Sequence, residues 1–259
     1  VLRAQGQWDA EQICGLIRTH RINVLGFTPS YGSQLAQWLA TQRQTLPVRL
    51  CITGGEALTG EHLQRIRAAF QPQVFFNAYG PTETVVMPLA GLAPQHLAEG
   101  VGSVPIGSIV GARVAYILDA DLALVPQGAS GELYVGGAGL AQGYHQRPGM
   151  TAERFVADPF AAHGGRLYRT GDLVRQLSDG QVEYLGRIDH QVKIRGFRIE
   201  LGEIETRLLE HPAVREAVVL ALDSPSGKQL VAYLASDAEH GAVRDALKAH
   251  LKAQLPDYM

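Results

Sequence analysis

Apolar residues in the first hundred positions follow two patterns that alternate along the chain. Short runs that are mostly apolar, typical of buried strands, occupy residues 22–27, 48–53 and 74–77. Apolar positions at helical spacing predict helices over residues 10–20, 31–41 and 58–70. Such an alternation indicates a parallel sheet with helices on its faces, and ligands of such sheets bind beyond the carboxyl ends of the strands. We therefore expect chemistry in the segments 26–29, 54–57 and 77–83.

The pattern changes near residue 101, where short strands with a period of two replace the continuous runs. These strands are predicted over residues 113–118, 131–135, 166–169, 173–176 and 182–184. Turns rich in Gly, Pro and Asp separate them, including a glycine turn at Gly171. This part of the chain is predicted to form a small antiparallel β-barrel or sandwich.

A third unit begins near Asp189 and has the order helix, strand, strand, helix. Its elements are predicted over residues 201–209, 214–222, 229–235 and 242–254. The predicted fold class is therefore α/β. Its predicted parts are a portion of a parallel-sheet α/β core over 1–105, a small antiparallel β-barrel over 106–188 and a C-terminal α+β subdomain over 189–259.

The composition describes a neutral globular chain. Its 259 residues include 23 basic and 25 acidic side chains, a net charge of −2, and 46% of the residues are apolar. This balance gives no electrostatic reason to expect nucleic acid or an anionic membrane as a partner, and no apolar stretch is long enough for a membrane span. Two cysteines, Cys14 and Cys51, are too few for a disulfide framework, which favours buried apolar roles in a reducing compartment, the cytoplasm. Because the chain begins at Val1 without an initiator methionine, we expect it to be a piece of a longer protein.

The segment 77–84, which reads NAYGPTET, follows a predicted strand and carries several reactive groups. A bend at Gly80 and Pro81 lets backbone amides approach an anion closely. Glu83 is the kind of hard carboxylate that Mg²⁺ binds together with phosphate oxygens, and Tyr79 offers a flat face to a nucleobase. The alternative is a plain β-turn with an exposed acid.

Two further segments offer charged groups. Asp172 ends the sequence YRTGD and is predicted to accept ribose hydroxyls, the alternative being an ordinary hairpin aspartate. A dense set of cations follows, consisting of Arg187, Lys193, Arg195 and Arg198. These cations are suited to neutralising phosphate charge beside segment 77–84, or to protecting a solvated edge strand.

Other candidate features indicate structure more than chemistry. The glycines between Gly131 and Gly143 match neither the Rossmann nor the phosphate-loop spacing, so we expect them to serve the backbone. The nine histidines include no pair at metal-ligand spacing on one helix, and no Ser-His-Asp or Cys-His set is recognisable.

Seven motifs occur in order along essentially the whole chain. They read NAYGPTE (77–83), GELYV (131–135), LAQGYHQRP (140–148), TAERFVADPF (151–160), YRTGD (168–172), GRIDHQVKIRG (186–196) and FRIELGEIE (197–205). In this order they resemble the amino-acid adenylation domain of nonribosomal peptide synthetases, a branch of the adenylate-forming, AMP-binding superfamily. TAERFVADPF and RGFRIELGEIE are more similar to this branch than to acyl-CoA ligases or luciferases.

The resemblance implies an ATP-dependent and Mg²⁺-dependent ligase that forms an aminoacyl adenylate. The nucleotide contacts that it implies are Gly55, Glu56, Asn77, Ala78, Tyr79, Gly80, Thr82, Asp172, Tyr184 and Arg187. It further implies that Tyr79 stacks on adenine, that Asp172 binds ribose and that Glu83 is the metal ligand. The catalytic residues that it implies are Thr82, Glu83 and Lys193.

The resemblance also implies a substrate pocket, a hinge and partners. The implied pocket walls are Gly26, Ile52, Gly54, Ala78, Val86 and Met87. These walls are small or apolar and none is charged, which predicts a bulky apolar or aromatic amino acid. Asp189 is the implied hinge, and Lys193 and Gly196 lie in the loop that serves transfer to a carrier-protein phosphopantetheine thiol. The implied partners are the peptidyl carrier domain and the condensation domain of a synthetase that makes an antibiotic or siderophore.

Three features of the family pattern are missing from the sequence. The glycine-rich phosphate loop and the aspartate that holds the substrate amino group are expected upstream of Val1, and residues 255–259 stop before the segment with the family's C-terminal catalytic lysine. We therefore expect the chain alone to be inactive. An acyl-CoA ligase of the same superfamily and a non-catalytic nucleotide-binding module are the alternative functions.

Overall fold

The computed structural model describes residues 9–98, 101–162, 164–189, 191–194, 196–224, 227–236 and 240–259. The chain divides into two compact units, Val1–Ile188 and Asp189–Met259. The predicted cation Arg195 and part of the predicted turn between the last two strands lie outside the described residues. None of the helices in the described ranges is long and apolar enough to cross a membrane.

The first unit begins with a five-stranded sheet in the order β1-β2-β3-β4-β5. Its strands are β1 (Val24–Phe27), β2 (Leu50–Thr53), β3 (Val74–Tyr79), β4 (Leu89–Leu92) and β5 (Ser108–Ile109). The first three strands are parallel, whereas β4 and β5 join antiparallel. The predicted parallel sheet is thus confirmed, and the two antiparallel strands that extend it were not predicted.

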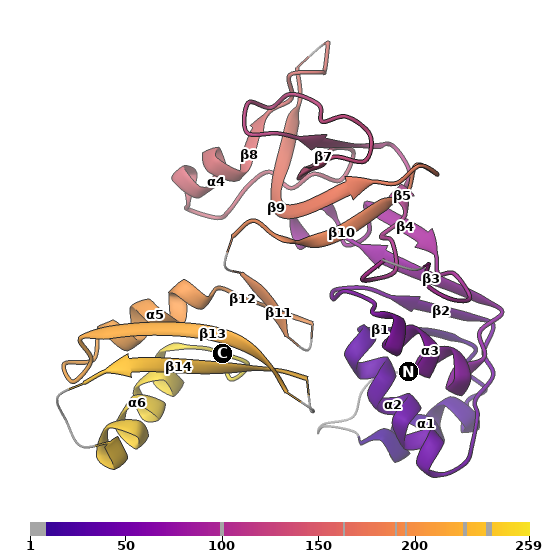
Figure 1. Cartoon of the computed structure of the whole chain (residues 1–259), viewed down its shortest axis with the longest axis horizontal. Coiled ribbons are helices and arrows are strands. Elements are labelled where there is room, and N and C mark those ends of the chain that lie inside the picture. The colour runs from indigo at the N-terminus through magenta and orange to yellow at the C-terminus, as the bar shows by residue number, and fades with distance from the viewer. Residues whose placement is uncertain are drawn as a thin grey trace. The chain divides into compact units, whose positions relative to one another are not determined.

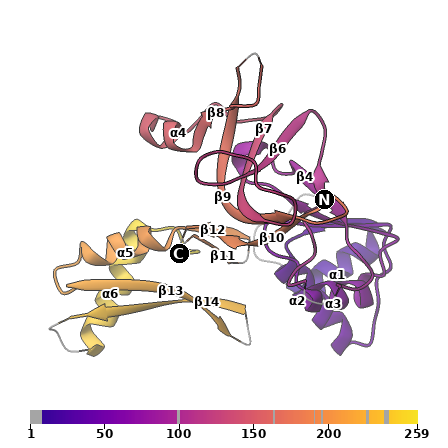
Figure 2. The ribbon, with the colours of Figure 1, turned by 45° about the horizontal axis from the view of Figure 1, so that its top comes forward.

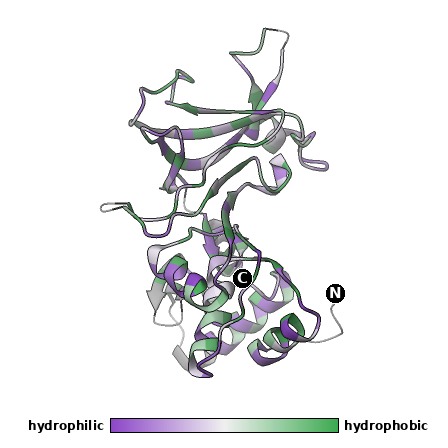
Figure 3. Ribbon diagram, turned by 90° about the vertical axis from the view of Figure 1, so that its right-hand side faces the viewer, coloured by the Kyte–Doolittle hydropathy of each residue, from purple (hydrophilic) through white to green (hydrophobic). Residues whose placement is uncertain are grey.

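Three helices cover one face of this sheet (Figure 1). They are α1 (Ala10–Thr19), α2 (Pro29–Thr41) and α3 (Gly60–Phe70). The side chains of Asp9, Thr28 and Thr59 accept backbone hydrogen bonds at the three N-termini, which fixes where each helix starts. Each helix carries both hydrophobic and hydrophilic segments, as a helix with one buried face must (Figure 3).

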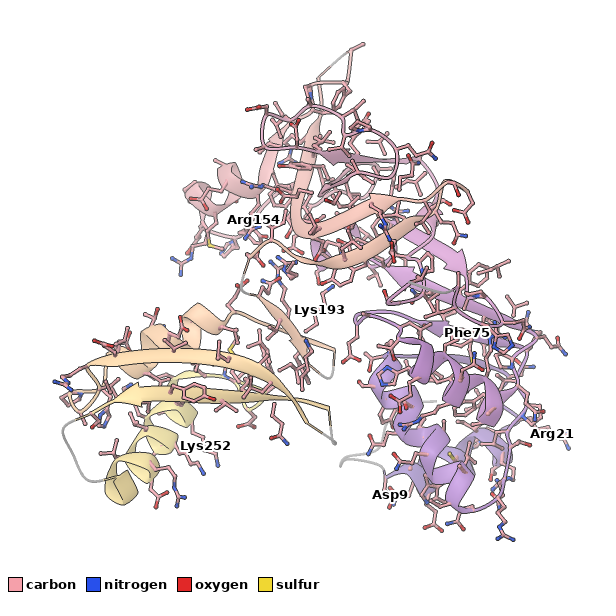
Figure 4. The ribbon with its side chains drawn as sticks, in the orientation of Figure 1. Asp9, Arg21, Phe75, Arg154, Lys193 and Lys252 are labelled. Atoms are coloured by element: carbon pink, nitrogen blue, oxygen red, sulfur yellow. The ribbon has the colours of Figure 1, made fainter. Side chains whose placement is uncertain are left out.

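The core beneath the helices contains both cysteines. Cys14 and Cys51 are fully buried beside Leu39 and Phe70, and Phe75 of β3 lies in the same cluster (Figure 4). Burial raises the pKa of the Cys51 thiol to about 12, so the thiol stays protonated at neutral pH. The prediction that the cysteines are buried apolar residues is confirmed.

The rest of the first unit is antiparallel. A sheet in the order β10-β9-β7-β6, with β8 paired to β9, contains β6 (Arg113–Leu118), β7 (Ser130–Gly137), β8 (Phe155–Ala157), β9 (Arg166–Gln176) and β10 (Val182–Arg187). The short helix α4 (Pro148–Arg154) leads directly into β8. The predicted glycine turn at Gly171 was wrong, because β9 runs through this residue without a break. Gly171 has φ +73° and forms a bulge, where three residues of β9 lie opposite one of β7.

The second unit combines two hairpins with two helices (Figure 2). Its elements are β11 (Val192–Ile194), β12 (Phe197–Ile199), α5 (Leu201–Leu209), β13 (Glu216–Ser224), β14 (Gly227–Ala235) and α6 (His240–Gln254). Helix α5 has the predicted bounds, and its buried Ile204 and Leu208 share a core with Val219 and Leu247. The β11–β12 hairpin was not predicted.

An aromatic stack ties this hairpin to the end of the chain. The rings of Phe197, on β12, and Tyr258 are nearly parallel, with their centroids 4.4 Å apart and an interplanar angle of 5°.

We predict that Tyr258→Ala destabilises the hairpin by about 1 kcal/mol, because stacked pairs contribute roughly 0.5–1.5 kcal/mol beyond their buried area. Faster amide hydrogen exchange across β11 and β12 is the expected result. Tyr258→Phe, which keeps the ring, is expected to restore protection, and equal exchange in all three proteins would contradict the prediction.

Candidate active site

Asp172 is the centre of the site in the first unit. Its carboxylate, on β9, is 2% exposed. Oδ2 accepts a hydrogen bond from the hydroxyl of Tyr79, the last residue of β3, and Oδ1 accepts one from Nη1 of Arg187 on β10 at 2.9 Å. The Asp172 amide donates to Thr170 Oγ1 at 3.0 Å. Three strands that carry three different motifs therefore meet at one buried carboxylate.

The bulge at Gly171 explains why Asp172 has this position. Glu132 of β7, itself buried, accepts a hydrogen bond from the Gly171 amide at 3.0 Å and pairs with Arg169 at 3.0 Å. Across β9 and β10, Asp172 and Arg187 are direct register partners. On β10 a register shift between Tyr184 and Gly186 precedes this pair, and Asp172 lies within a strand, not in the hairpin turn that the sequence indicated.

Tyr79 lies mostly inside the protein. It is 5% exposed, and its ring belongs to a buried cluster with Leu89, Leu133 and Val174. Burial, followed by the neighbouring Asp172 carboxylate, raises the pKa of Tyr79 well above its ordinary value, so the hydroxyl stays a donor. Little of the ring is open to the adenine that the resemblance implies, and its stacking role stays a prediction.

Asn77 and its neighbours are held tightly by the backbone around them. The Asn77 side-chain amide donates to the carbonyls of Val104 and Pro105 at 3.0 and 3.1 Å. A Cβ at Gly54 would lie 2.7 Å from the Ala78 carbonyl, and one at Gly80 would lie 2.5 Å from the Val86 carbonyl. Both glycines are therefore needed for close approach of two chain segments.

The loop after β2 supports the start of α2. Gly55 has φ +84°, and the next residue, Glu56, accepts a hydrogen bond from the Ser30 amide at 3.1 Å. Ser30 lies in the first turn of α2, where an acidic group is favourable because of the free N–H groups of the helix. The carboxylate predicted to lie beside a nucleotide thus also fixes a helix N-terminus.

Thr82 and Glu83 lie in a 3₁₀ turn, η1 (Thr82–Thr84), beyond β3. Glu83 is 9% exposed, and its Oε1 accepts a hydrogen bond from the Tyr144 hydroxyl at 2.6 Å. Burial and this hydrogen bond raise the pKa of Tyr144. Within the described ranges no three His, Cys, Asp or Glu side chains converge to hold a metal. A single hard carboxylate nevertheless fits Mg²⁺, which binds one or two carboxylates and takes its other ligands from phosphate and water.

Four of the six predicted pocket walls share one face of the sheet. Gly26 and Ile52 are register partners on parallel strands, and Gly54 would place a Cβ 3.7 Å from that of Ala78. This face is opposite the one that packs on α1 to α3, and nothing lies within 4 Å of a Cβ built at Gly26.

The other two walls, Val86 and Met87, are exposed. Val86 is 68% exposed and has φ +61°, and Val85 has φ +57°. The Met87 amide donates to the Val85 carbonyl at 2.7 Å, which closes a tight turn. Two adjacent β-branched residues with positive φ are strained, and such strain concentrates in functional segments.

The predicted cations fall in different units. Arg187 belongs to the first unit and is committed to Asp172, with 8% of its side chain exposed. Lys193 and Arg198 belong to the second unit, on β11 and β12, and Arg198 pairs with Glu200 at 3.8 Å. Tyr184, on β10, packs against the buried cluster of Tyr79.

Three residues of the site were missed by sequence reasoning. Glu132 and Thr170 hold the Asp172 bulge, and Tyr144 binds Glu83. All three lie inside the seven ordered motifs, but the partners of Tyr144 and Glu132 are 61 and 39 positions away, and contacts at that separation leave no local pattern.

Comparisons with known proteins identify the family. The AMP-binding enzyme family matches residues 1–145, and the AMP-binding enzyme C-terminal domain matches residues 203–259. The chain therefore belongs to the AMP-binding enzyme family.

Three curated relatives are similar to the chain over most of its length. Tyrocidine synthase 3 of Brevibacillus parabrevis is 44% identical over 252 residues, and malpinin synthetase of Mortierella alpina is 50% identical over 224 residues. The dimodular nonribosomal peptide synthase of Bacillus subtilis (strain 168) is 42% identical over 253 residues. These matches cover 97%, 83% and 97% of this chain but only 4%, 3% and 10% of the relatives. The chain thus spans a small part of each of these much longer proteins.

Solved structures agree with this assignment. An artificially fused adenylation–PCP di-domain, NpsA-ThdA from Klebsiella oxytoca, has a TM-score of 0.83 at 26% identity. The match covers 98% of this chain and 46% of the di-domain chain. Holo-PA1221, a protein with adenylation and PCP domains, has a TM-score of 0.82 at 27% identity. The match covers 97% of this chain and 43% of the PA1221 chain. The resemblance to adenylation domains of nonribosomal peptide synthetases is confirmed.

The buried pair of Asp172 and Arg187 leads to a prediction about stability. Arg187→Ala leaves the Asp172 charge buried without its cation, which costs about 3–5 kcal/mol in unfolding free energy. The control is Arg65→Ala, because Arg65 and Glu61 form an exposed pair that contributes less than about 1 kcal/mol. Chemical denaturation of both variants measures the difference, and equal losses would contradict it.

Proposed function

We propose that the chain is part of an amino-acid adenylation domain, which activates an amino acid as aminoacyl-AMP for nonribosomal peptide synthesis. The observation that carries the proposal is the meeting of β3, β9 and β10 at Asp172, in a chain whose relatives include a nonribosomal peptide synthase. A carboxylate held by donors of the chain itself is oriented before the ligand arrives, which suits it to accept ribose hydroxyls.

The proposed reaction joins the amino-acid carboxylate to the α-phosphorus of ATP and releases pyrophosphate. The task of the chain is to position the reactants, because phosphoryl chemistry depends on positioning and charge neutralisation. Glu83 is the residue that would hold Mg²⁺, which would neutralise phosphate charge. The Thr82 hydroxyl contacts phosphate or the substrate carboxylate. The further nucleotide contacts that we propose are Gly55, Glu56, Asn77, Ala78, Tyr79, Gly80, Tyr184 and Arg187.

We propose that the substrate side chain is bulky and apolar or aromatic. Gly26 leaves volume on one face of the sheet, Gly54 and Ala78 form small walls beside it, and Ile52 makes this face apolar. The exposed, strained turn at Val86 and Met87 closes the proposed pocket.

The second half-reaction transfers the aminoacyl group from the adenylate to a carrier-domain phosphopantetheine thiol, which forms a thioester and releases AMP. We propose Asp189 as the hinge for this step, and the division into compact units falls at this residue. The proposed layout is a core over 1–105, a small barrel over 106–188 and a C-terminal subdomain over 189–259. The peptidyl carrier and condensation domains are the proposed partners.

Amino-acid-dependent pyrophosphate exchange tests the first half-reaction, in a complete adenylation domain that contains this chain. We expect exchange with bulky apolar and aromatic amino acids. Two amino acids whose side chains differ by one methylene are expected to differ about 10- to 200-fold in kcat/KM, because an apolar pocket discriminates to this extent. Preference for aspartate or lysine would overturn the substrate class.

Two further measurements on the same complete domain, ATP affinity and coenzyme A-dependent turnover, distinguish the other functions. Asp172→Ala is expected to weaken ATP binding, whereas unchanged ATP affinity in Asp172→Ala and Glu83→Ala indicates a non-catalytic module. Turnover of a free acid that requires coenzyme A indicates an acyl-CoA ligase.

Lys193 tests the second half-reaction. We predict that Lys193→Ala slows thioester formation on the carrier at least about tenfold, which is 1.4 kcal/mol, and leaves pyrophosphate exchange unchanged. Lys252 is the matched control, an exposed lysine on α6 of the same unit (Figure 4). Equal effects of Lys193→Ala and Lys252→Ala on transfer would refute the role.

A further inference from the structure

The motif LAQGYHQRP meets the turn of Glu83 at two points. The Ala141 amide donates to the Glu83 carbonyl at 2.8 Å, and the Tyr144 hydroxyl donates to Glu83 Oε1 at 2.6 Å. One bond holds the backbone of Glu83 and the other holds its carboxylate. Tyr144 and Glu83 are 61 positions apart in the sequence, so this contact exists because of the fold.

The backbone of Tyr144 is fixed by the next motif, TAERFVADPF. The Tyr144 amide donates to Thr151 Oγ1 at 2.9 Å, and the same hydroxyl donates to the Arg147 carbonyl at 2.9 Å. Gly143 has φ +149°, and a Cβ there would lie 2.4 Å from Thr151 Cγ2. Thr151 and Gly143 therefore specify where the Tyr144 side chain begins.

The ring of Tyr144 is fixed by two other aromatic residues. Phe155 meets it edge-on, with the ring centroids 5.7 Å apart and an interplanar angle of 69°. The hydroxyl of the fully buried Tyr168 lies 3.4 Å from the Tyr144 hydroxyl. Phe155 and Tyr168 also pack on each other, with centroids 5.2 Å apart. The phenol is thus held at both its edge and its hydroxyl.

A glutamate side chain has several rotatable bonds, and a free carboxylate loses conformational entropy when it binds a ligand. A carboxylate that already has a fixed donor on one oxygen loses less. Partners of this kind, which orient a metal ligand without touching the metal, typically change metal affinity by 10- to 100-fold.

We propose that Tyr144 is a positioning residue that orients Glu83 for the magnesium ion of Mg·ATP, with Thr151, Phe155 and Tyr168 as its support. This inference rests on the proposed function, which makes Glu83 the metal ligand. It gives the motifs LAQGYHQRP and TAERFVADPF a role in the chemistry, because together they place one phenol hydroxyl within hydrogen-bond distance of one carboxylate oxygen.

The test uses Tyr144→Phe in a complete adenylation domain that contains this chain. Calorimetric titration with ATP, at free Mg²⁺ concentrations set from limiting to saturating, measures binding without turnover. We expect the Mg²⁺ concentration for half-maximal binding to rise about tenfold, and ATP affinity to recover at saturating Mg²⁺. The amino-acid KM in pyrophosphate exchange at saturating Mg²⁺ is expected to stay unchanged, because Tyr144 contacts Glu83 and its three supporting residues, none of which is a proposed pocket wall.

The matched control is Tyr134→Phe. Tyr134 is buried and, like Tyr144, donates to a glutamate, in this case to Glu132 Oε2 of the antiparallel region at 3.3 Å. It is expected to leave the Mg²⁺ dependence unchanged. Thr151→Ala, which removes the acceptor for the Tyr144 amide, is the second variant, and it is expected to shift the Mg²⁺ dependence in the same direction.

The outcomes separate this inference from the proposed function. If the unmodified domain shows no Mg²⁺-dependent ATP binding, both are overturned. If it does, an unshifted Mg²⁺ dependence in Tyr144→Phe overturns the inference alone. Loss of ATP affinity that saturating Mg²⁺ does not restore, or an equal shift in Tyr134→Phe, also overturns it, because either result indicates a general structural effect. Should Tyr144→Phe fail to fold, an unshifted Thr151→Ala overturns the inference and a shift supports it.

Discussion

The buried charge of Asp172 is the constraint on which the first unit depends. A carboxylate with 2% exposure has lost its hydration, a cost of several kcal/mol that matched donors must offset. Tyr79 and Arg187 are those donors, and they come from β3 and β10. Asp172 therefore links the mixed sheet to the antiparallel sheet, since a shift of either strand would leave the charge without a partner.

Much of the secondary structure could be predicted from local sequence. Helix α5 has the expected bounds, and Thr59 caps α3 as its position before an apolar helical pattern indicates. The error at Gly171 has a physical reason, because a glycine with positive φ serves a turn and a bulge equally well. The choice between a turn and a bulge depends on Glu132, a buried residue on another strand that accepts a hydrogen bond from the Gly171 amide.

The same distinction between local sequence and long-range contacts applies to the site. Motifs at strand ends predict which residues carry chemistry, because strand ends are where a parallel sheet binds ligands. They do not predict which internal partner each residue has. The ring of Tyr79 is mostly buried, and the amide of Asn77 is committed to two backbone carbonyls. Such commitments come from contacts across 27 to 93 residues, and no local spacing encodes them.

These commitments bear on how the site works under the proposed function. Asp172, Glu83 and Glu56 each accept at least one hydrogen bond from the chain itself, from Arg187, Tyr144 and Ser30. An ionised carboxylate has about four acceptor positions, so one or two internal donors fix its orientation and leave capacity for a ligand. The residues that stabilise the fold are thus the residues that orient the acceptors. A substitution in the supporting motifs therefore acts on chemistry through geometry, because the carboxylate remains and its direction changes.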